Sequence, residues 1–291
     1  MLSMEKLKIL LPKGRIYENV VKLFEGAGIT IKLPDRAYRP TVNQDDLEAK
    51  VMKPQNIGKL LELGAHDCGF TGCDWIKETN TDVEEILDLG FDGVRIVAAV
   101  PNQLDDAMLK AKRIIVATEY EKISKEWLDS NGYNSDIIRT SGATEVFPPD
   151  DADMIIDNTS TGRTLIENGL RIVDTLMTSS TRFFASKEAM KNPAKKQKIM
   201  ELKMLFESVL DARSRVMLEM NVTADNLKKL VAEVPAMRSP TVSPLYSETD
   251  VVTGYAVKTV AKKSEIPNLL PKLKELGATD ILEYELRKVL S

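Results

Sequence analysis

Short apolar runs alternate with amphipathic segments along most of the chain. The runs that predict buried strands are residues 7–11, 47–52, 68–70, 93–102 and 113–120, and residues 136–146 predict a strand followed by a turn. Apolar residues at helical spacing follow several of them, in residues 16–28, 53–65 and 121–132. This alternation predicts βαβ units of an α/β fold, in which the turns after the strands gather at one edge of a sheet.

The pattern changes after about Met217. Residues 217–222, 237–246, 253–261 and 280–286 read as strands or extended segments, and residues 224–234 and 266–278 as helices. Before them, residues 187–216 predict a long helical stretch that is broken near Pro193. The order β-α-β-β-α-β is typical of a ferredoxin-like module. Modules of this kind often bind small molecules where their sheets pair, which supports a hypothesis of regulation by analogy of fold.

The stretch DMIIDNTSTGRT, residues 153–164, carries the most specific chemistry. Met154 to Ile156 predict the end of a buried parallel strand, and Asp157 is expected where that strand emerges. Residues 158–164 then predict a hydroxyl-rich turn that leads into a helix, which suits a phosphate. Asp157 cannot bind the same phosphate, but its carboxylate can accept hydrogen bonds from sugar hydroxyls or help to hold a cation. The alternative is a turn that only caps a helix, and these residues alone leave both interpretations open.

Other turns add candidate phosphate contacts. PKGR places Lys13 and Arg15 around Gly14 after the first strand, although a solvated basic turn is the simpler interpretation. Thr71 to Asp74 predict a second glycine-bearing turn. Residues 141–144, Ser-Gly-Ala-Thr, form a further candidate anion site and are followed by Glu145.

Composition narrows the class of protein. The chain has 291 residues, of which 43% are hydrophobic and 29% charged, a net charge of −4 and only two cysteines, Cys68 and Cys73. These values predict a soluble protein of two or three domains without a disulfide framework and argue against nucleic acid as a partner. With His66 as its only histidine, the sequence makes a zinc site or a Ser-His catalytic pair improbable. The N-terminal run lacks the pattern of a signal peptide and no run approaches the roughly 20 apolar residues of a membrane span, so we expect a cytoplasmic protein.

Taken together, the motifs resemble those of the long-form ATP phosphoribosyltransferases, the first enzymes of histidine biosynthesis. LLPKGR, KPQNIGKLLELGAHDCGFTGCDW, GATEV, DNTSTGRTLIENGL and MNV with RSPTVSPL occur in the family's order over nearly the whole chain. The resemblance implies a bilobal catalytic unit like the periplasmic binding proteins and an ACT-like C-terminal domain. The corresponding ranges are residues 1–95 for lobe I with a return segment 180–215, 96–179 for lobe II with the phosphoribosyl-diphosphate loop, and 216–291 for the regulatory domain.

The resemblance also implies a reaction. The adenine N1 of ATP displaces diphosphate from C1 of 5-phosphoribosyl-1-diphosphate, with Mg²⁺ bound through the substrate phosphates and in part by Asp157 rather than in an all-protein site. Asp157 and Glu145 are the implied catalytic residues. The implied phosphoribosyl-diphosphate site comprises Asp157, Thr159, Ser160, Thr161, Gly162, Arg163 and Thr164. The implied nucleotide and phosphate contacts are Lys13, Gly14, Arg15, Lys53, Thr71, Gly72 and Asp74.

For the third domain the resemblance implies feedback inhibition by histidine and a homohexamer, with a dimer as another state. Ser239, Thr241 and Ser243 are candidate histidine contacts, although a rigid strand edge beside prolines is an equally good interpretation. Two positions depart from the family pattern. Asp150 and Asp151 replace a usual glycine, and Lys53 stands where relatives often have arginine.

Three alternatives stay open from sequence. A solute-binding protein has the same bilobal fold, a catalytically silent regulatory subunit has the same domains, and a phosphoribosyltransferase acting on a free base needs no third domain. The intact DNTSTGRT turn favours an active enzyme over the silent subunit.

Overall fold

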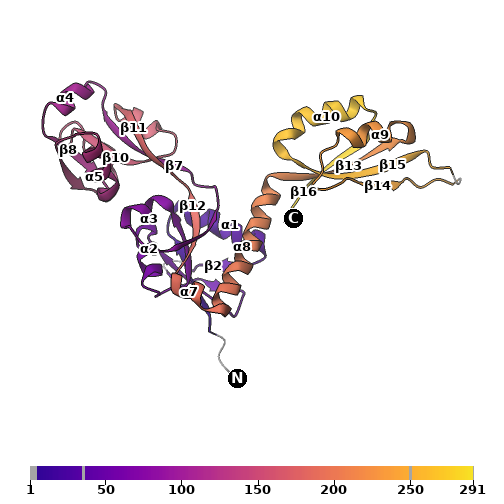
Figure 1. Cartoon of the computed structure of the whole chain (residues 1–291), viewed down its shortest axis with the longest axis horizontal. Helices are drawn as coiled ribbons and strands as arrows, with labels where there is room; N and C mark the ends of the chain where they lie inside the picture. The colour runs from indigo at the N-terminus through magenta and orange to yellow at the C-terminus, as the bar shows by residue number, and fades with distance from the viewer. Residues whose placement is uncertain (1–4, 35–36, 249–250, 291) are drawn as a thin grey trace. The chain divides into compact units, whose positions relative to one another are not determined.

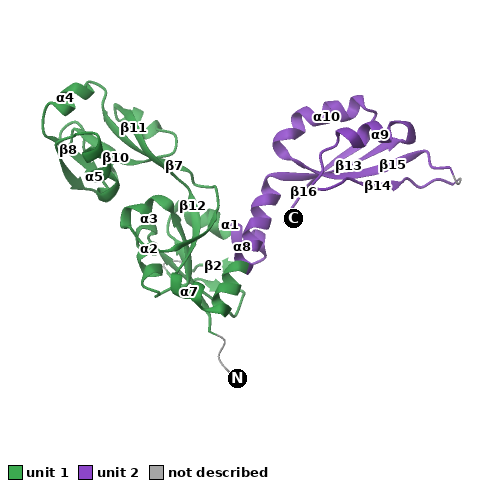
Figure 2. Cartoon of the chain, viewed as in Figure 1, with its two compact units in different colours: residues 1–21, 30–200 green, residues 22–29, 201–291 purple. Residues whose placement is uncertain are grey.

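A computed structural model describes residues 5–34, 37–248 and 251–290. The fold divides into two compact units, shown in different colours in Figure 2. The first unit comprises Met1–Val21 and Thr30–Met200, and the second comprises Lys22–Ile29 and Glu201–Ser291. The helices α1 (Arg15–Ala27) and α8 (Pro193–Arg213) each contribute residues to both units.

The first sheet of the first unit has the strand order β4-β1-β5-β12-β6. Its strands are β1 (Leu7–Pro12), β4 (Leu47–Met52), β5 (Cys68–Gly72), β6 (Glu84–Asp88) and β12 (Thr181–Ala185). Three of these strands, β4, β1 and β5, run parallel, and β12 is antiparallel to both of its neighbours. Leu10 and Phe184 of this sheet pack against Ile57 and Leu61 of α2. The helices nearby in sequence are α2 (Pro54–Glu62), α3 (Cys73–Thr79) and α7 (Lys187–Lys191), and a short hairpin is formed by β2 (Ile31–Lys32) and β3 (Thr41–Val42).

The second sheet has the order β11-β7-β10-β8-β9. Its strands are β7 (Val94–Pro101), β8 (Ile114–Thr118), β9 (Ser135–Arg139), β10 (Met154–Thr159) and β11 (Leu170–Ser179). It is mixed, because β10, β8 and β9 run parallel whereas β7 is antiparallel to β10 and to β11. The other elements around it are α4 (Asp106–Lys110), α5 (Glu121–Ser130), η1 (Thr144–Val146) and α6 (Arg163–Glu167), some of which are labelled in Figure 1.

Two local predictions were wrong. The strand expected to end at Ile156 continues to Thr159, because Asp157, Asn158 and Thr159 pair with Val97 to Arg95 of β7. The turn expected at Thr71–Asp74 does not form. Instead, Thr71 and Gly72 complete β5 and Cys73 begins α3, so that the strand leads directly into the helix.

The chain leaves the first sheet between β6 and β7 and returns to it between β11 and β12. Two sheets joined by two crossings are the bilobal α/β arrangement expected from the sequence, and this fold class is confirmed. The boundaries at residues 95, 179 and 215 stay predictions.

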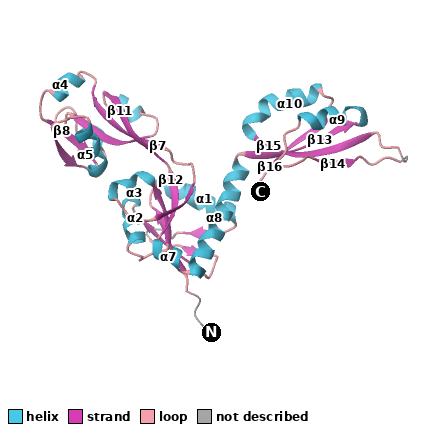
Figure 3. Ribbon diagram, in the orientation of Figure 1, coloured by secondary structure: helices cyan, strands magenta, loops and turns pink. Residues whose placement is uncertain are grey.

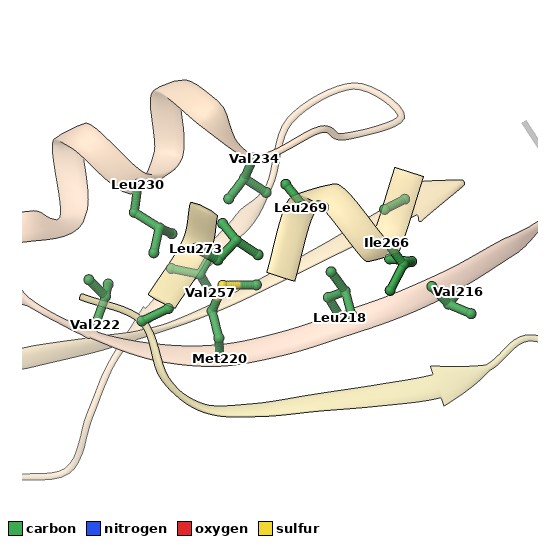
Figure 4. Packing of buried hydrophobic residues seen from close by; sticks show 12 residues of the cluster. Val216, Leu218, Met220, Val222, Leu230, Val234, Val257, Ile266, Leu269 and Leu273 are labelled. Carbon is green, nitrogen blue, oxygen red and sulfur yellow. The ribbon is translucent and has the colours of Figure 1, made fainter. Parts of the chain in front are cut away.

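The second unit contains the predicted β-α-β-β-α-β order. Its elements are β13 (Arg215–Thr223), α9 (Ala224–Glu233), β14 (Thr241–Pro244), β15 (Gly254–Lys262), α10 (Ile266–Glu275) with η2 (Lys263–Glu265) before it, and β16 (Thr279–Glu285). The sheet is antiparallel with the order β14-β15-β13-β16, and both helices lie on one side of it (Figure 3). Figure 4 shows Leu230, Leu269 and Leu273 of these helices packed on Leu218 and Met220 of β13. Among the described residues, no helix has both the length and the apolar character needed to cross a bilayer.

Candidate active site

The polar turn between β10 and α6 surrounds a pocket of about 390 Å³, which we call the turn pocket. Its lining includes Asp157, Asn158, Thr159, Ser160, Thr161 and Thr164, together with Arg15, Val94, Glu145 and Leu165. Gly162 has a φ of 79°, a left-handed conformation that favours glycine and lets the chain enter α6. The structure therefore gathers most of the predicted phosphoribosyl-diphosphate residues, along with Glu145 and Arg15, around one pocket.

Hydroxyl groups shape this turn. The Thr159 hydroxyl accepts a hydrogen bond from the Gly162 N–H at 2.9 Å, and the Thr161 hydroxyl accepts one from the Arg163 N–H at 3.3 Å. Each hydroxyl keeps its own proton, which it can donate to a phosphate oxygen. Arg163 is different, because its side chain is 83% exposed and its Nε donates to Glu167 Oε1 at 2.7 Å. A helix-capping role and a phosphate-binding role are thus compatible in the same turn.

Asp157 is partly buried, and two other acidic side chains, Glu119 and Glu145, lie close enough to affect its charge. The pKa of Asp157 is raised from 3.8 to about 6, mainly by burial and also by the charges of Glu119 and Glu145, while hydrogen bonds from the Asn158 backbone N–H and the Thr144 hydroxyl oppose the rise. Because the three carboxylates repel one another, the site favours binding of a proton or a cation, and its oxygens can also accept hydrogen bonds from sugar hydroxyls.

Thr144, which the sequence predicts as part of a candidate anion turn, also contributes to the surroundings of Asp157, a role that the sequence did not predict. It is buried, and its hydroxyl lies 2.9 Å from the hydroxyl of Thr140, which is also buried. Since Thr144 is in η1 beside Glu145, this pair anchors the segment that brings both residues to Asp157. The signal in the sequence is the threonine of GATEV, which directly precedes the predicted acid Glu145.

Asp74 lies at the centre of a buried network beside a second pocket, the central pocket, of about 220 Å³. Its side chain accepts hydrogen bonds on both oxygens, from the Ser179 hydroxyl at 2.6 Å and from the Tyr120 phenol at 2.8 Å. Asn158 in turn donates to the Tyr120 oxygen at 3.2 Å. Burial, with Asp74 alongside, raises the pKa of Tyr120, so the phenol stays a donor. Asp74 therefore joins α3 to β11 and to Tyr120, which leaves it less free for a ligand than the sequence indicates.

The remaining predicted phosphate contacts are distributed over different places. Arg15 lines both the turn pocket and the central pocket, and Gly72 lines the central pocket. Lys13 and Gly14 instead line a separate pocket of about 400 Å³, where Lys13 Nζ lies 5.4 Å from the centre of the Tyr38 ring. Thr71 is fully buried, and its hydroxyl donates to the Pro54 carbonyl oxygen at 3.0 Å.

Lys53 lines a further pocket of about 260 Å³, which we call the Arg139 pocket. Its lining comprises Lys53, Gln55, Asn56, Trp75, Glu119, Arg139, Thr140 and Ser141. Gln55, Trp75 and Glu119 also line the central pocket, which itself shares Arg15, Val94 and Asn158 with the turn pocket. These shared walls place the three pockets in a row: turn pocket, central pocket, Arg139 pocket.

In the second unit, the candidate histidine contacts are exposed. Thr241 and Ser243 lie on β14, where they pair with Lys258 and Ala256 of β15, and Ser239 precedes the strand. The described residues, those around Asp157 included, contain no group of three or more His, Cys, Asp or Glu side chains that could hold a metal ion.

Two family models match this chain from residue 53 onward. One described as "ATP phosphoribosyltransferase" matches residues 53–208, and one described as "HisG, C-terminal domain" matches residues 212–288. The chain belongs to the ATP phosphoribosyltransferase family. Membership confirms the resemblance seen in the motifs and the predicted class, a transferase of histidine biosynthesis, and it sets aside the alternative of a solute-binding protein.

Individual relatives of the ATP phosphoribosyltransferase family match over the full length. A protein of Thermodesulfovibrio yellowstonii with the same name as the family is 40% identical over 98% of both chains. Another, from Chlorobaculum parvum, is 37% identical over 98% of this chain and 97% of its own. A solved structure of the ATP phosphoribosyl transferase (HisG:HisZ) complex from Thermotoga maritima superposes with a TM-score of 0.61 at 25% identity, covering 69% of this chain and 98% of that one.

Proposed function

We propose that this chain transfers the phosphoribosyl group of 5-phosphoribosyl-1-diphosphate to N1 of the adenine of ATP and releases diphosphate. Family membership supports the reaction. The turn pocket carries the proposal on the structural side, because hydroxyls and carboxylates suited to a ribose 5-phosphate line the same cavity.

Each side of the turn pocket has a proposed role. Thr159, Ser160, Thr161 and Thr164 donate hydrogen bonds to the 5-phosphate, and the backbone at Gly162 allows its close approach. Arg163 is a weaker contact, since it is already paired with Glu167. In the same lining, Asp157 and Glu145 accept hydrogen bonds from the ribose hydroxyls.

The chemistry requires positioning rather than a protein nucleophile. The bond from C1 to the diphosphate oxygen breaks with its electron pair leaving on diphosphate, and the lone pair of adenine N1 forms the new bond to C1. Loss of a proton from the adenine amino group then balances the charge on the ring. Positive charge develops at C1 as diphosphate leaves, and the carboxylates of Asp157, Glu145 and Glu119 provide the negative field that stabilises it.

We propose Mg²⁺ as the cofactor. The raised pKa of Asp157, with Glu145 and Glu119 beside it, fits a place where a cation joins the carboxylates when substrates bind. When bound, the ion neutralises the leaving diphosphate. Asp157 is the residue that would hold it on the protein side, together with oxygens of the substrates.

The second unit is proposed to be regulatory, with histidine bound beside β14 at Ser239, Thr241 and Ser243. Assembly into a hexamer, with a dimer as another state, is part of the same proposal. Leu282 and Tyr284 support association, because they are 50% and 41% exposed and lie on the sheet face away from the buried side chains of β13. The two free cysteines, one of them buried, fit a reducing compartment and thus the expected cytoplasmic location.

A turnover assay tests the activity. Purified protein is mixed with ATP, 5-phosphoribosyl-1-diphosphate, Mg²⁺ and a diphosphatase, and the near-ultraviolet absorbance of the alkylated adenine is followed. We expect turnover in the parent, loss of it in Asp157→Ala, and retention in the matched control Asp151→Ala, whose side chain is exposed outside the turn pocket. A folded protein that binds ATP without turnover would instead be the silent regulatory subunit.

A further inference from the structure

Asp92 is a buried carboxylate in the segment that connects the two sheets of the first unit. It lies between β6 and β7, at the first of the two crossings, and lines the central pocket. Its side chain is 7% exposed, and its Oδ1 accepts a hydrogen bond from Asn19 Nδ2 at 2.8 Å. Across residues 5–34, 37–248 and 251–290, the buried Oδ2 has no hydrogen-bond partner. A buried carboxylate oxygen without a donor is costly, so we looked for the group that can supply one.

Arg15 on α1 is the cation beside this carboxylate. Its Nε lies 3.9 Å from Asp92 Oδ1, too far for a hydrogen bond, and its side chain is 70% exposed. Arg15 and Asn19 are four residues apart on one helix, so they approach Asp92 from the same face of α1. A guanidinium that turns its Nε edge to both oxygens of a carboxylate forms a bidentate pair and keeps its remaining N–H groups for an anion.

Backbone contacts fix the crossing that carries Asp92. The Thr181 N–H donates to the Phe91 carbonyl oxygen at 3.0 Å, and the Leu89 N–H donates to the Thr181 carbonyl oxygen at 3.1 Å. These bonds join the segments of the two crossings to each other. The backbone of Asp92 itself is left-handed, with a φ of 53°, a conformation that aspartate and asparagine adopt more readily than most residues. Asp92 therefore has a fixed place from which to orient the exposed side chain of Arg15.

The location of Arg15 makes its orientation important for an anionic substrate. Within the described ranges of the chain, Arg15 is the one Lys or Arg residue in the linings of the turn pocket and the central pocket. Those linings also contain several carboxylates, among them Asp157, Glu145 and Glu119, which repel phosphate. In the proposed function the hydroxyl turn takes the 5-phosphate, which leaves the diphosphate of the same substrate to Arg15.

We propose that Asp92 is a positioning residue, which holds the guanidinium of Arg15 by its Nε edge and directs the other nitrogens at the diphosphate of 5-phosphoribosyl-1-diphosphate. The identity of the anion rests on the proposed function, whereas the pairing of Asp92 with Arg15 does not. Charge alone predicts the opposite effect, because removing a negative charge at roughly 8 Å in water should tighten an anion about two- to threefold. The sign of the change therefore distinguishes orientation from repulsion.

Asp92→Asn removes the charge with little change of shape. Asparagine tolerates a left-handed backbone, and its amide oxygen can still accept the hydrogen bond from Asn19. Asp92→Gly is the second variant, since it removes the whole side chain without straining the same φ. The matched control is Asp136→Asn, which removes a carboxylate paired with the exposed Arg113 in the second sheet, outside the linings of the three neighbouring pockets.

Calorimetric titration of diphosphate with Mg²⁺ into each protein measures binding without turnover. We expect Asp92→Asn and Asp92→Gly to weaken diphosphate about five- to tenfold, as for one poorly aligned charge-assisted hydrogen bond, and Asp136→Asn to leave it unchanged. Arg15→Gln should weaken it at least as much, and adding Asp92→Asn to Arg15→Gln should cause no further weakening, because the group to be positioned is gone. In steady-state assays of Asp92→Asn, kcat/KM for 5-phosphoribosyl-1-diphosphate should fall by a similar factor, with KM for ATP within about twofold of the parent.

Four results would overturn the proposal. Unchanged or tighter diphosphate binding in Asp92→Asn would leave Asp92 as a repelling charge or a structural group. The same weakening by Asp92→Asn with and without Arg15→Gln would show that the two residues act separately. A KM for ATP raised as much as kcat/KM for the other substrate falls would assign the effect to the fold. Failure of the parent to bind diphosphate would remove the anion from Arg15. By contrast, diphosphate binding that depends on Asp92 and Arg15 in a protein without turnover would contradict the proposed function and keep this inference.

Discussion

At the scale of the residue, the protonation of Asp157 sets an acid limit on activity. Burial raises the pKa of Asp157 to about 6, and only its carboxylate form can accept the ribose hydroxyls as proposed. We therefore expect kcat/KM for 5-phosphoribosyl-1-diphosphate to fall as pH drops through about 6, since this parameter reports the free enzyme. A pH profile from about pH 5 to pH 9 checks this. An Asp151→Asn protein should keep the inflection, and a parent profile that stays flat through this range would contradict the assignment.

The raised pKa of Asp157 also predicts a pH dependence of stability, and its direction is opposite to that of activity. The pKa of Asp157 rises from 3.8 to about 6 on folding, so the native state takes up a proton between these values and stability falls as pH rises through them. Above about pH 6 the buried charge costs about 3 kcal/mol. We expect Asp157→Asn to be inactive yet about 1–2 kcal/mol more stable near neutrality, with the gain disappearing near pH 4. Urea unfolding at both pH values measures it, and a variant less stable at neutral pH would refute the account.

At the scale of the element, Tyr120, the residue directly before α5, ties this part of the chain to α3 and β10. Its phenol donates to Asp74 and accepts from Asn158, and both groups lose a partner in Tyr120→Phe. The ring can still stack on Trp75, so the change isolates the hydroxyl. We expect a loss of about 1–3 kcal/mol in unfolding free energy, because a buried carboxylate oxygen is left unsatisfied, and a lower kcat, because Asn158 adjoins Asp157.

Tyr133→Phe is the control for that measurement. Tyr133 stacks on Trp127 with ring centroids 5.4 Å apart, and none of the three neighbouring pockets has it in its lining. Its substitution should leave kcat within about twofold of the parent. If Tyr120→Phe behaves as Tyr133→Phe does, the network around Asp74 has no part in positioning the site.

The same elements show which features a sequence can predict. The turn from Asp157 to Thr164 is contiguous, so local chemistry alone predicts most of its residues. The extension of β10 to Thr159 escapes prediction because Asp157, Asn158 and Thr159 are polar, and only pairing with β7 makes them a strand. For Asp74 the sequence does not predict the hydrogen-bond partners. Its partners Tyr120 and Ser179 are 46 and 105 positions away, and no local pattern relates such distant side chains.

At the scale of the whole molecule, the second unit is not a simple C-terminal appendage. It includes residues 22–29, where Phe24 packs edge-on against Phe206 with ring centroids 4.9 Å apart, and where Lys288 Nζ donates to the Ala27 carbonyl oxygen at 2.8 Å. The sequence pattern changes near Met217 and so predicts that the second unit begins there. It does not reveal that residues 22–29 belong to the same unit, because contacts between the two ends of a chain leave no local pattern. A truncation there would remove Lys288 and disturb α1, so point variants are the better test of regulation.

Histidine inhibition should depend on one face of the β14 edge. Thr241 and Ser243 pair with Lys258 and Ala256, which puts them on the same sheet face as the ion pair between Lys258 and Glu219, whose Nζ and Oε1 are 3.3 Å apart. Paired charges beside hydroxyls match the ammonium and carboxylate of an amino acid. We expect Thr241→Val with Ser243→Ala to raise the half-inhibiting histidine concentration at least about tenfold.

Turnover without histidine should be unchanged in that double variant, because its residues belong to the second unit and the turn pocket to the first. Val242→Thr is the control, since Val242 pairs with Val257 on the opposite, helix-covered face of the sheet. Inhibition curves for the three proteins at one ATP concentration make the comparison. Because an inhibitor acts at a distance only through a difference in its affinity for two states, weaker histidine binding must appear as weaker inhibition. Unchanged inhibition in the double variant, with turnover intact, would move the histidine site away from β14.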